Sequence, residues 1–77
     1  MVTPESIEAS IAAGIVCESV DVAGDGAHFE ARIVSSAFEG LSRVRRHQLV
    51  YAALGDRMRE EIHALSMTTL TPAEAQR

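Results

Sequence analysis

The sequence predicts an α+β domain in which a three-stranded mixed sheet carries helices on one face. Three observations support this fold class: helix-capping signals recur along the chain, alternating apolar and polar residues mark the stretches between them, and a glycine-containing turn joins two of those stretches. A chain of 77 residues makes one domain, so residues 1–77 are treated as a single unit. The expected order is α-β-β-α-α-β-α.

The first helix is expected to begin after Thr3, a residue type favoured at the N-cap. Ile7, Ile11 and Ala12 fall on one face of this helix and are expected to pack against the sheet. Gly14 is the expected end, because glycine is the residue most often found just past a helix C-terminus.

A β-hairpin with one exposed face is predicted next. Residues 19–22 and 29–34 each alternate apolar and polar side chains, which is typical of half-buried strands. The turn between them contains Gly24 and Gly26, and glycine adopts positive φ without steric cost.

The main helix is expected to start at Ser42, which can cap it, after a loop in which Phe38 forms an apolar plug. Its core face is predicted from helical spacing. The predicted core residues are Val44, Val50, Tyr51, Ala53, Leu54 and Met58. The arginines in its first turn are expected to face water.

The C-terminal part is predicted to hold a short helix, a strand and a last short helix. Gly55 and Asp56 end the main helix and begin the next, and residues 62–69 alternate as a third strand. A helical connection between two strands favours parallel pairing through a right-handed crossover. Thr71 and Glu74 form a capping-box pattern for the final helix.

The charge of the chain is unevenly distributed. The net charge of −4 argues against bulk attraction to nucleic acid or an anionic membrane, yet a basic cluster opens the main helix. The basic cluster consists of Arg43, Arg45, Arg46 and His47. It is a candidate surface for a partner or for nucleic acid; the alternative is a solvated face paired with Glu39, Glu60 and Glu61.

Several classes of protein are disfavoured by missing patterns. The single cysteine, Cys17, rules out an intrachain disulfide and fits a reducing, cytoplasmic setting. We expect no signal peptide and no membrane association, because no basic-then-apolar leader and no apolar run of about 18 residues is seen. Phosphate-binding loops, Cys-x-x-Cys pairs and catalytic triads are equally absent from the sequence, so a non-enzymatic role is expected.

The remaining candidates for metal chemistry are histidines. His28 follows the hairpin turn and His63 stands near the start of the third strand, so both imidazoles could lie near one edge of the sheet. Two ligands do not close a structural metal site, but they can form half of one that another molecule completes. The alternatives are a solvated His28 and a hydrogen-bonded His63. For His47 a surface role or hydrogen bond, and for Cys17 a buried, unreactive thiol, are the expected roles.

Three blocks of the sequence resemble the BolA family. The blocks are Phe38-x-Gly40-x-Ser42-Arg43-Val44-x-Arg46-His47, Ile62-His63-Ala64-Leu65-Ser66 and Leu70-Thr71-Pro72. The hairpin segment Gly24-Asp25-Gly26-x-His28-Phe29 is similar to the bacterial IbaG-like branch, which is associated with acid resistance. The resemblance implies a fold akin to a class II KH domain without its Gly-x-x-Gly loop.

The resemblance also implies a partner and a cofactor. BolA-like proteins pair with monothiol glutaredoxins and share a [2Fe–2S] cluster, to which glutaredoxin and glutathione supply thiolates. Carried over by position, His63 and His28 are the implied ligands here, whereas Cys17 precedes the first strand and does not match. The isolated chain is then expected without the cluster. Because imidazole binds metal when neutral, cluster binding is expected to weaken below about pH 6.5.

Two other functions stay open. Some BolA-like proteins are described as transcriptional regulators of stress and morphology genes, which would use the arginine-rich helix to bind DNA weakly. Gln48 stands where many family members have a further basic residue. The other possibility is an adaptor that docks on glutaredoxin without metal, and a homodimer is a further possibility.

Overall fold

The structure is a computed structural model that describes residues 2–60, 62 and 64–77, without the side chains of residues 59 and 60. Its elements follow the predicted order, with one added turn of 3₁₀ helix. They are α1 (Pro4–Gly14), β1 (Ser19–Gly24), β2 (His28–Val34), η1 (Ser36–Phe38), α2 (Arg43–Leu54), α3 (Arg57–Glu60), β3 (Ala64–Leu70) and α4 (Pro72–Ala75).

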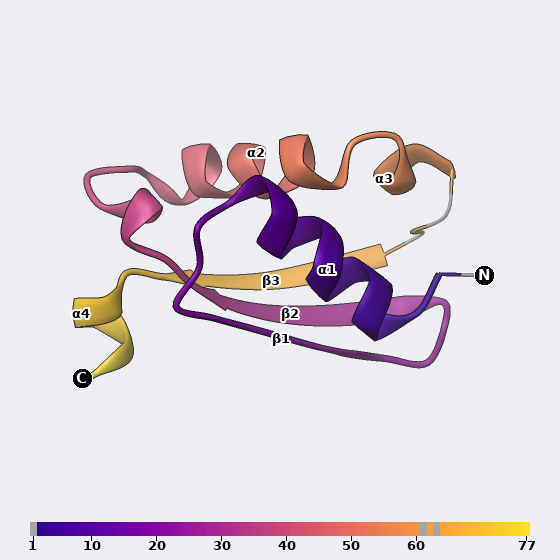
Figure 1. Ribbon diagram of the computed structural model, residues 1–77, viewed down its shortest axis with the longest axis horizontal. Helices are drawn as coiled ribbons and strands as arrows, with labels where there is room; N and C mark the ends of the chain where they lie inside the picture. The colour runs from indigo at the N-terminus through magenta and orange to yellow at the C-terminus, as the bar shows by residue number, and fades with distance from the viewer. Residues whose placement is uncertain (1, 61, 63) are drawn as a thin grey trace.

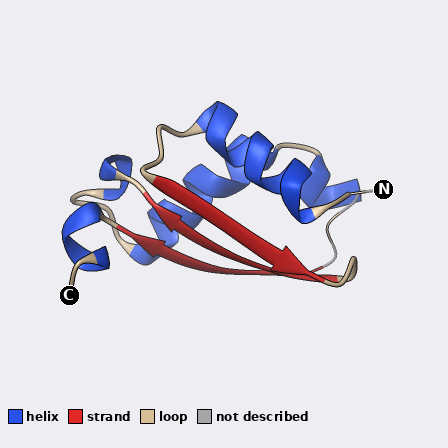
Figure 2. Cartoon of the chain, turned by 60° about the horizontal axis from the view of Figure 1, so that its bottom comes forward, coloured by secondary structure: helices blue, strands red, loops and turns tan. Residues whose placement is uncertain are grey.

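The sheet has the strand order β1-β2-β3 and is mixed, as predicted (Figure 1). β1 and β2 pair antiparallel through the hairpin, and β2 and β3 pair parallel. A parallel pair needs a long connection, which α2 and α3 provide. Both long helices lie on the same side of the sheet, with α1 packed on β1 and α2 reaching towards β3 (Figures 1 and 2). The other face of the sheet is left open.

The core is aliphatic apart from two phenylalanines. Ile7 and Ile11 of α1 are fully buried against Ile33 of β2, and Phe29 and Phe38 close the two ends of this cluster. Phe38 is therefore the apolar plug that the sequence predicts. Among the described residues, no helix is long and apolar enough to cross a membrane.

The N-caps of α1, α2 and α4 are those expected from the sequence. The Thr3 hydroxyl accepts a hydrogen bond from the Ser6 backbone N–H at 3.1 Å, and Ser42 does the same for Arg45 at 3.3 Å. The capping box predicted for α4 is also formed. Each cap satisfies an N–H group that has no partner inside its helix.

The predicted core faces of the helices are partly wrong. Ala12 is exposed, and on α2 Val44 is 65% and Tyr51 41% exposed. The inward-facing row of α2 is spaced by four residues and runs through the half-buried Arg46 and the buried Val50 and Leu54, which places Val44 on a different side of the helix. Val50 and Leu54 are buried as predicted.

The boundaries of the strands also differ from the prediction. β1 extends to Gly24 and β2 begins at His28, so the hairpin is longer than the alternation indicates. β3 begins at Ala64 and not at Ile62. The backbone N–H of Ile62 donates to the carbonyl of Arg57 at 2.9 Å, so Ile62 is bonded to α3 and lies outside the β2–β3 ladder.

Gly24 lies where the hairpin backbone meets the core. It pairs with Phe29 across the ladder, and a Cβ atom at Gly24 would collide with the Phe29 ring and the His28 carbonyl. A side chain at this position must therefore displace the ring or the strand that begins at His28.

We predict that Gly24→Ala lowers the free energy of unfolding by about 1–3 kcal/mol, because it overpacks this contact. The matched control is Ala23→Val, which adds carbon atoms at an exposed position of the same strand and should stay within about 0.5 kcal/mol of wild type. Urea unfolding measures both variants. A Gly24→Ala variant as stable as Ala23→Val would contradict the close packing described here.

Candidate metal and partner site

The hairpin end that carries His28 is held by Asp25. One carboxylate oxygen, Oδ1 of Asp25, accepts hydrogen bonds from the backbone N–H groups of His28 and Ala27, both at 2.9 Å. These hydrogen bonds, that from His28 first, lower the pKa of Asp25. Gly26 takes φ of +99°, a conformation that suits glycine. The His28 backbone is thereby fixed while its side chain is exposed.

The ladder brings the start of β3 beside His28. In the parallel pairing of β2 with β3, His28 is the partner of Ala64. His63, the other predicted ligand, lies outside the described residues. The strand pairing on which the two-histidine site depends is present, and the site itself stays a prediction.

The described part of the chain holds no group of three or more His, Cys, Asp or Glu side chains that could bind a metal ion. His28 is therefore not accompanied by a second and third ligand from the residues around the turn.

Cys17 lies at the other end of β1 from the hairpin turn. The six residues of β1 span about 20 Å, which separates the thiol from His28. Cys17 is half-buried and its Sγ donates to the Ile15 carbonyl at 3.3 Å. Burial raises the pKa of the thiol, so little thiolate is present for metal binding.

Within the basic cluster, Arg46 does not face water as predicted. Its side chain is 13% exposed and forms an ion pair with Glu74, at 2.7 Å between Nη1 and Oε1. Nε also donates to the Leu41 carbonyl at 2.9 Å, and Nη1 donates to the Thr69 carbonyl at 3.1 Å. The sequence suggested Glu39, Glu60 and Glu61 as partners of the whole cluster, whereas Arg46 pairs with Glu74.

The Arg46–Glu74 pair joins separate parts of the chain. The guanidinium carbon lies 6.0 Å from the centre of the Phe38 ring, and Glu74 also accepts from the Thr71 N–H at 2.8 Å. α2, the end of β3 and α4 are therefore tied through two side chains. The spacing of four residues between Arg46 and the buried Val50 is the signal in the sequence that could have predicted it.

The other members of the basic cluster lie on the surface. Arg43 and Arg45 are exposed and His47 is half-buried. Arg43 and His47 line a groove of about 550 Å³ between α2 and the last part of β3, whereas Arg45 lies outside it. Of the four residues of the basic cluster, Arg46 forms an ion pair, Arg43 and His47 line the groove, and Arg45 lies on the surface outside it.

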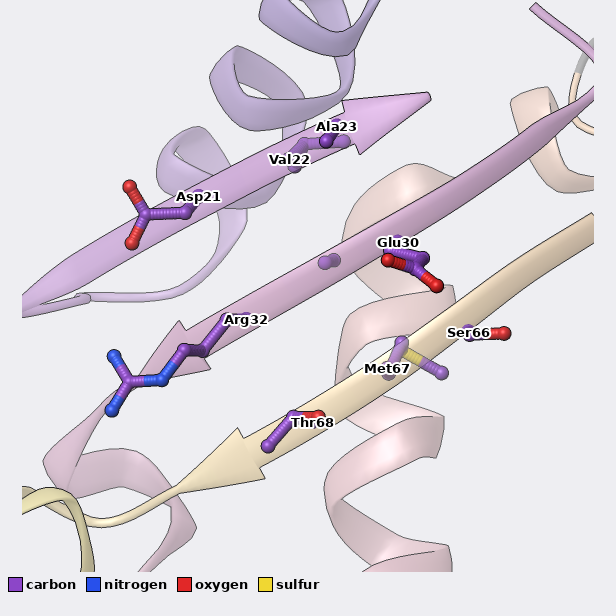
Figure 3. Close-up of a pocket in the computed structure, with 9 residues that line it drawn as sticks. Asp21, Val22, Ala23, Glu30, Arg32, Ser66, Met67 and Thr68 are labelled. Carbon is purple, nitrogen blue, oxygen red and sulfur yellow. The ribbon is translucent and has the colours of Figure 1, made fainter. Parts of the chain in front are cut away.

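The open face of the sheet is polar, as the alternation predicts. Glu30 and Arg32 project from β2 beside Ser66 and Thr68 of β3, along a shallow hollow of about 400 Å³ (Figure 3). Asp21 of β1 is the ladder partner of Arg32. Charges of both signs alternate across this face, so it lacks the single sign of charge that favours one class of ligand.

Comparison with known proteins identifies the family of the chain. The model of the BolA-like protein family matches residues 5–74. The chain belongs to the BolA-like family. The structure of a BolA protein homologue from Coxiella burnetii covers 100% of both chains with a TM-score of 0.85 and 45% identity, which confirms the predicted α+β fold.

The relatives of this BolA-like chain differ in length. Acid stress protein IbaG of Escherichia coli K12 is 43% identical over 58 residues, which cover 74% of the chain and 69% of IbaG. SufE-like protein 1 of Arabidopsis thaliana is 53% identical over 47 residues, which cover 61% of the chain and 13% of that protein. The match to bovine BolA-like protein 1 covers 38% of that protein. The chain thus spans well under two thirds of the last two relatives.

The ion pair with Arg46 lowers the pKa of Glu74 from 4.5 to about 2. A depressed pKa stabilises the fold above the unfolded-state value, and this contribution is lost as the pH falls from about 4.5 towards 2. We predict that the urea midpoint of wild type falls more steeply over this window than that of Glu74→Gln. Equal slopes would show that the pair does not contribute. Glu39→Gln, at an exposed carboxylate, is the matched control and should follow wild type.

Proposed function

We propose that this BolA-like chain is a non-enzymatic partner of a monothiol glutaredoxin and shares a [2Fe–2S] cluster with it. The role would be iron–sulfur cluster assembly or trafficking, or the sensing of iron or stress. The observation that carries the proposal is the state of His28: its imidazole is exposed, and its backbone is fixed by Asp25 beside the start of β3.

The donor set fits a shared cluster. His28 and His63 would hold it from this side, and a partner would complete the site with thiolates. Two thiolates with two imidazoles match the ligand types of Rieske-type centres, in which histidine raises the reduction potential. When bound, the cluster supplies one-electron redox chemistry and transferable iron and sulfide. This chain contributes the exposed imidazole of His28 on a fixed backbone, which is open to a ligand-bearing partner.

The family supports this assignment. The resemblance of the hairpin and of the block around His63 to BolA-like proteins implies the same two ligand positions, and the chain belongs to that family. A relative named as an acid stress protein and another named as SufE-like fit a role in stress or in iron–sulfur biology.

Co-expression with a monothiol glutaredoxin tests the proposal. His63→Ala should abolish the visible absorption and circular dichroism of the copurified complex, and His28→Ala should weaken or shift them, because each removes one ligand. His47→Ala is the matched control: it removes the third histidine, which lines the groove at α2, and should leave the spectrum unchanged. Wild-type spectra from both ligand variants would refute the two-histidine site.

The same samples separate cluster sharing from simple docking. Size-exclusion chromatography of the apo proteins measures whether a heterodimer forms without the cluster. If the apo heterodimer forms equally in wild type and His28→Ala, and no cluster spectrum appears in either, the chain is an adaptor and the cluster proposal is wrong.

Nucleic-acid binding by α2 is the second candidate, and the exposure of Arg43 and Arg45 favours it. Arg46 is engaged with Glu74, so the helix offers two of its three arginines to phosphate. We predict that any DNA affinity falls with salt at a log–log slope no steeper than about −2, since each phosphate contact contributes about −0.9. A salt titration by fluorescence anisotropy measures this slope. A steeper slope would mean that Arg46 leaves Glu74 or that another surface binds.

A further inference from the structure

β3 has a free edge that faces the groove beside α2. The strand order makes β3 an edge strand, which has β2 as its neighbour on one side only. The Ser35 N–H donates to the Leu70 carbonyl at 2.9 Å, so the backbone groups of Leu70 point towards β2. Because these groups alternate along a strand, those of Thr69, Met67 and Leu65 point away from β2.

Arg46 occupies one position of this edge and leaves the next one open. Its Nη1 donates to the outward carbonyl of Thr69, which confirms the direction of the alternation. In the part of the chain that the structure describes, no strand or side chain bonds the outward N–H and C=O of Met67. An unpaired edge of this kind is a template for another strand.

The groove along this edge has the size and charge for an acidic segment. It measures about 550 Å³ and is lined by Met67 and Thr69 on one side and by Arg43 and His47 of α2 on the other. Glu74 also lines it, but its carboxylate is engaged by Arg46. Arg43 is exposed, so the charge that a ligand would meet next to the open edge is positive on a chain of net charge −4.

We propose that this groove binds an extended peptide segment that pairs with β3 as a fourth strand and places a carboxylate side chain on Arg43. Backbone hydrogen bonds to Met67 supply affinity, and the charge contact sets register and selects acidic segments. This binding mode needs no metal and does not involve His28, so it stands apart from the cluster proposed above.

A nucleic-acid strand suits the groove less well. Binding of phosphates depends on several basic groups, and Arg46 is already neutralised by Glu74. Arg45 lies outside the groove, so it cannot contribute a contact there. A peptide strand, in contrast, satisfies both the outward N–H and the outward C=O of Met67.

NMR titration of the full chain with capped heptapeptides tests the proposal. The probe alternates valine and threonine around one central glutamate, and its counterpart carries lysine instead. The glutamate peptide should shift the amide signals of Leu65, Met67 and Thr69, and the lysine peptide should bind at least about fivefold more weakly, because one charge contact becomes repulsive.

Three variants sharpen the test. Arg43→Glu should weaken binding of the glutamate peptide by at least about fivefold, whereas Arg45→Glu, the same charge change outside the groove, should alter it less than about twofold. Met67→Pro removes the outward N–H and should abolish binding. An edge strand accepts proline at a position whose N–H faces away from the sheet. If Met67→Pro does not fold, the comparison of Arg43→Glu with Arg45→Glu still tests the proposal.

Several results would overturn the proposal. Equal effects of Arg43→Glu and Arg45→Glu would show general attraction between charges. Shifts confined to α2, with none on β3, would exclude strand pairing. Tighter binding of a single-stranded oligonucleotide at the same amides would assign the groove to nucleic acid, and loss of peptide binding through dimerisation at β3 would assign it to a second copy of the chain.

Discussion

The ion pair between Arg46 and Glu74 is the constraint on which the rest of the structure depends. A guanidinium has five N–H donors and is costly to remove from water unless they find acceptors. Here they bond the carboxylate of Glu74 and the carbonyls of Leu41 and Thr69, which belong to segments that the chain order keeps apart. α2 cannot shift along the sheet without breaking these contacts. The pair therefore ties α2 to the end of β3, which is paired in register with β2.

That register connects stability to the proposed function. The Arg46–Glu74 pair sits at the C-terminal end of β3, whereas His28 pairs with Ala64 at its N-terminal end. A parallel strand has a side-chain period of two, so a slip by one residue would move His28 to a new neighbour and turn the apolar side chains of β3 outwards. The position of His28 relative to the start of β3 thus depends on Asp25 and on the ladder, and the Arg46–Glu74 pair lies at the far end of that ladder, about 20 Å away along the strand.

The fold could be predicted from local signals, and the errors arose where a long-range contact decides. Thr3, Ser42 and Thr71 cap their helices because capping depends on neighbours three residues away. Arg46 was expected on the surface because arginine is usually exposed, but a carboxylate 28 residues further along the chain draws it inward. The orientation of α2 that turns Arg46 inward also leaves Val44 exposed. His28 is a predicted ligand because a turn and a family pattern coincide there, whereas the groove beside Arg43 depends on a strand edge that exists only after the sheet has formed.

The two proposed sites lie close together, because His28 on β2 pairs with the start of the strand that carries Met67, and this arrangement bears on how a partner would approach. The hairpin end meets β3 at Ala64, and the open edge position is Met67, three residues further on. Three residues of a strand span about 10 Å, less than the footprint of an ordinary protein interface. A partner that supplies ligands at the hairpin end would therefore lie within reach of the β3 edge, and an acidic segment of that partner could pair there. Two contacts made by one partner would reinforce each other, because the first makes the second intramolecular.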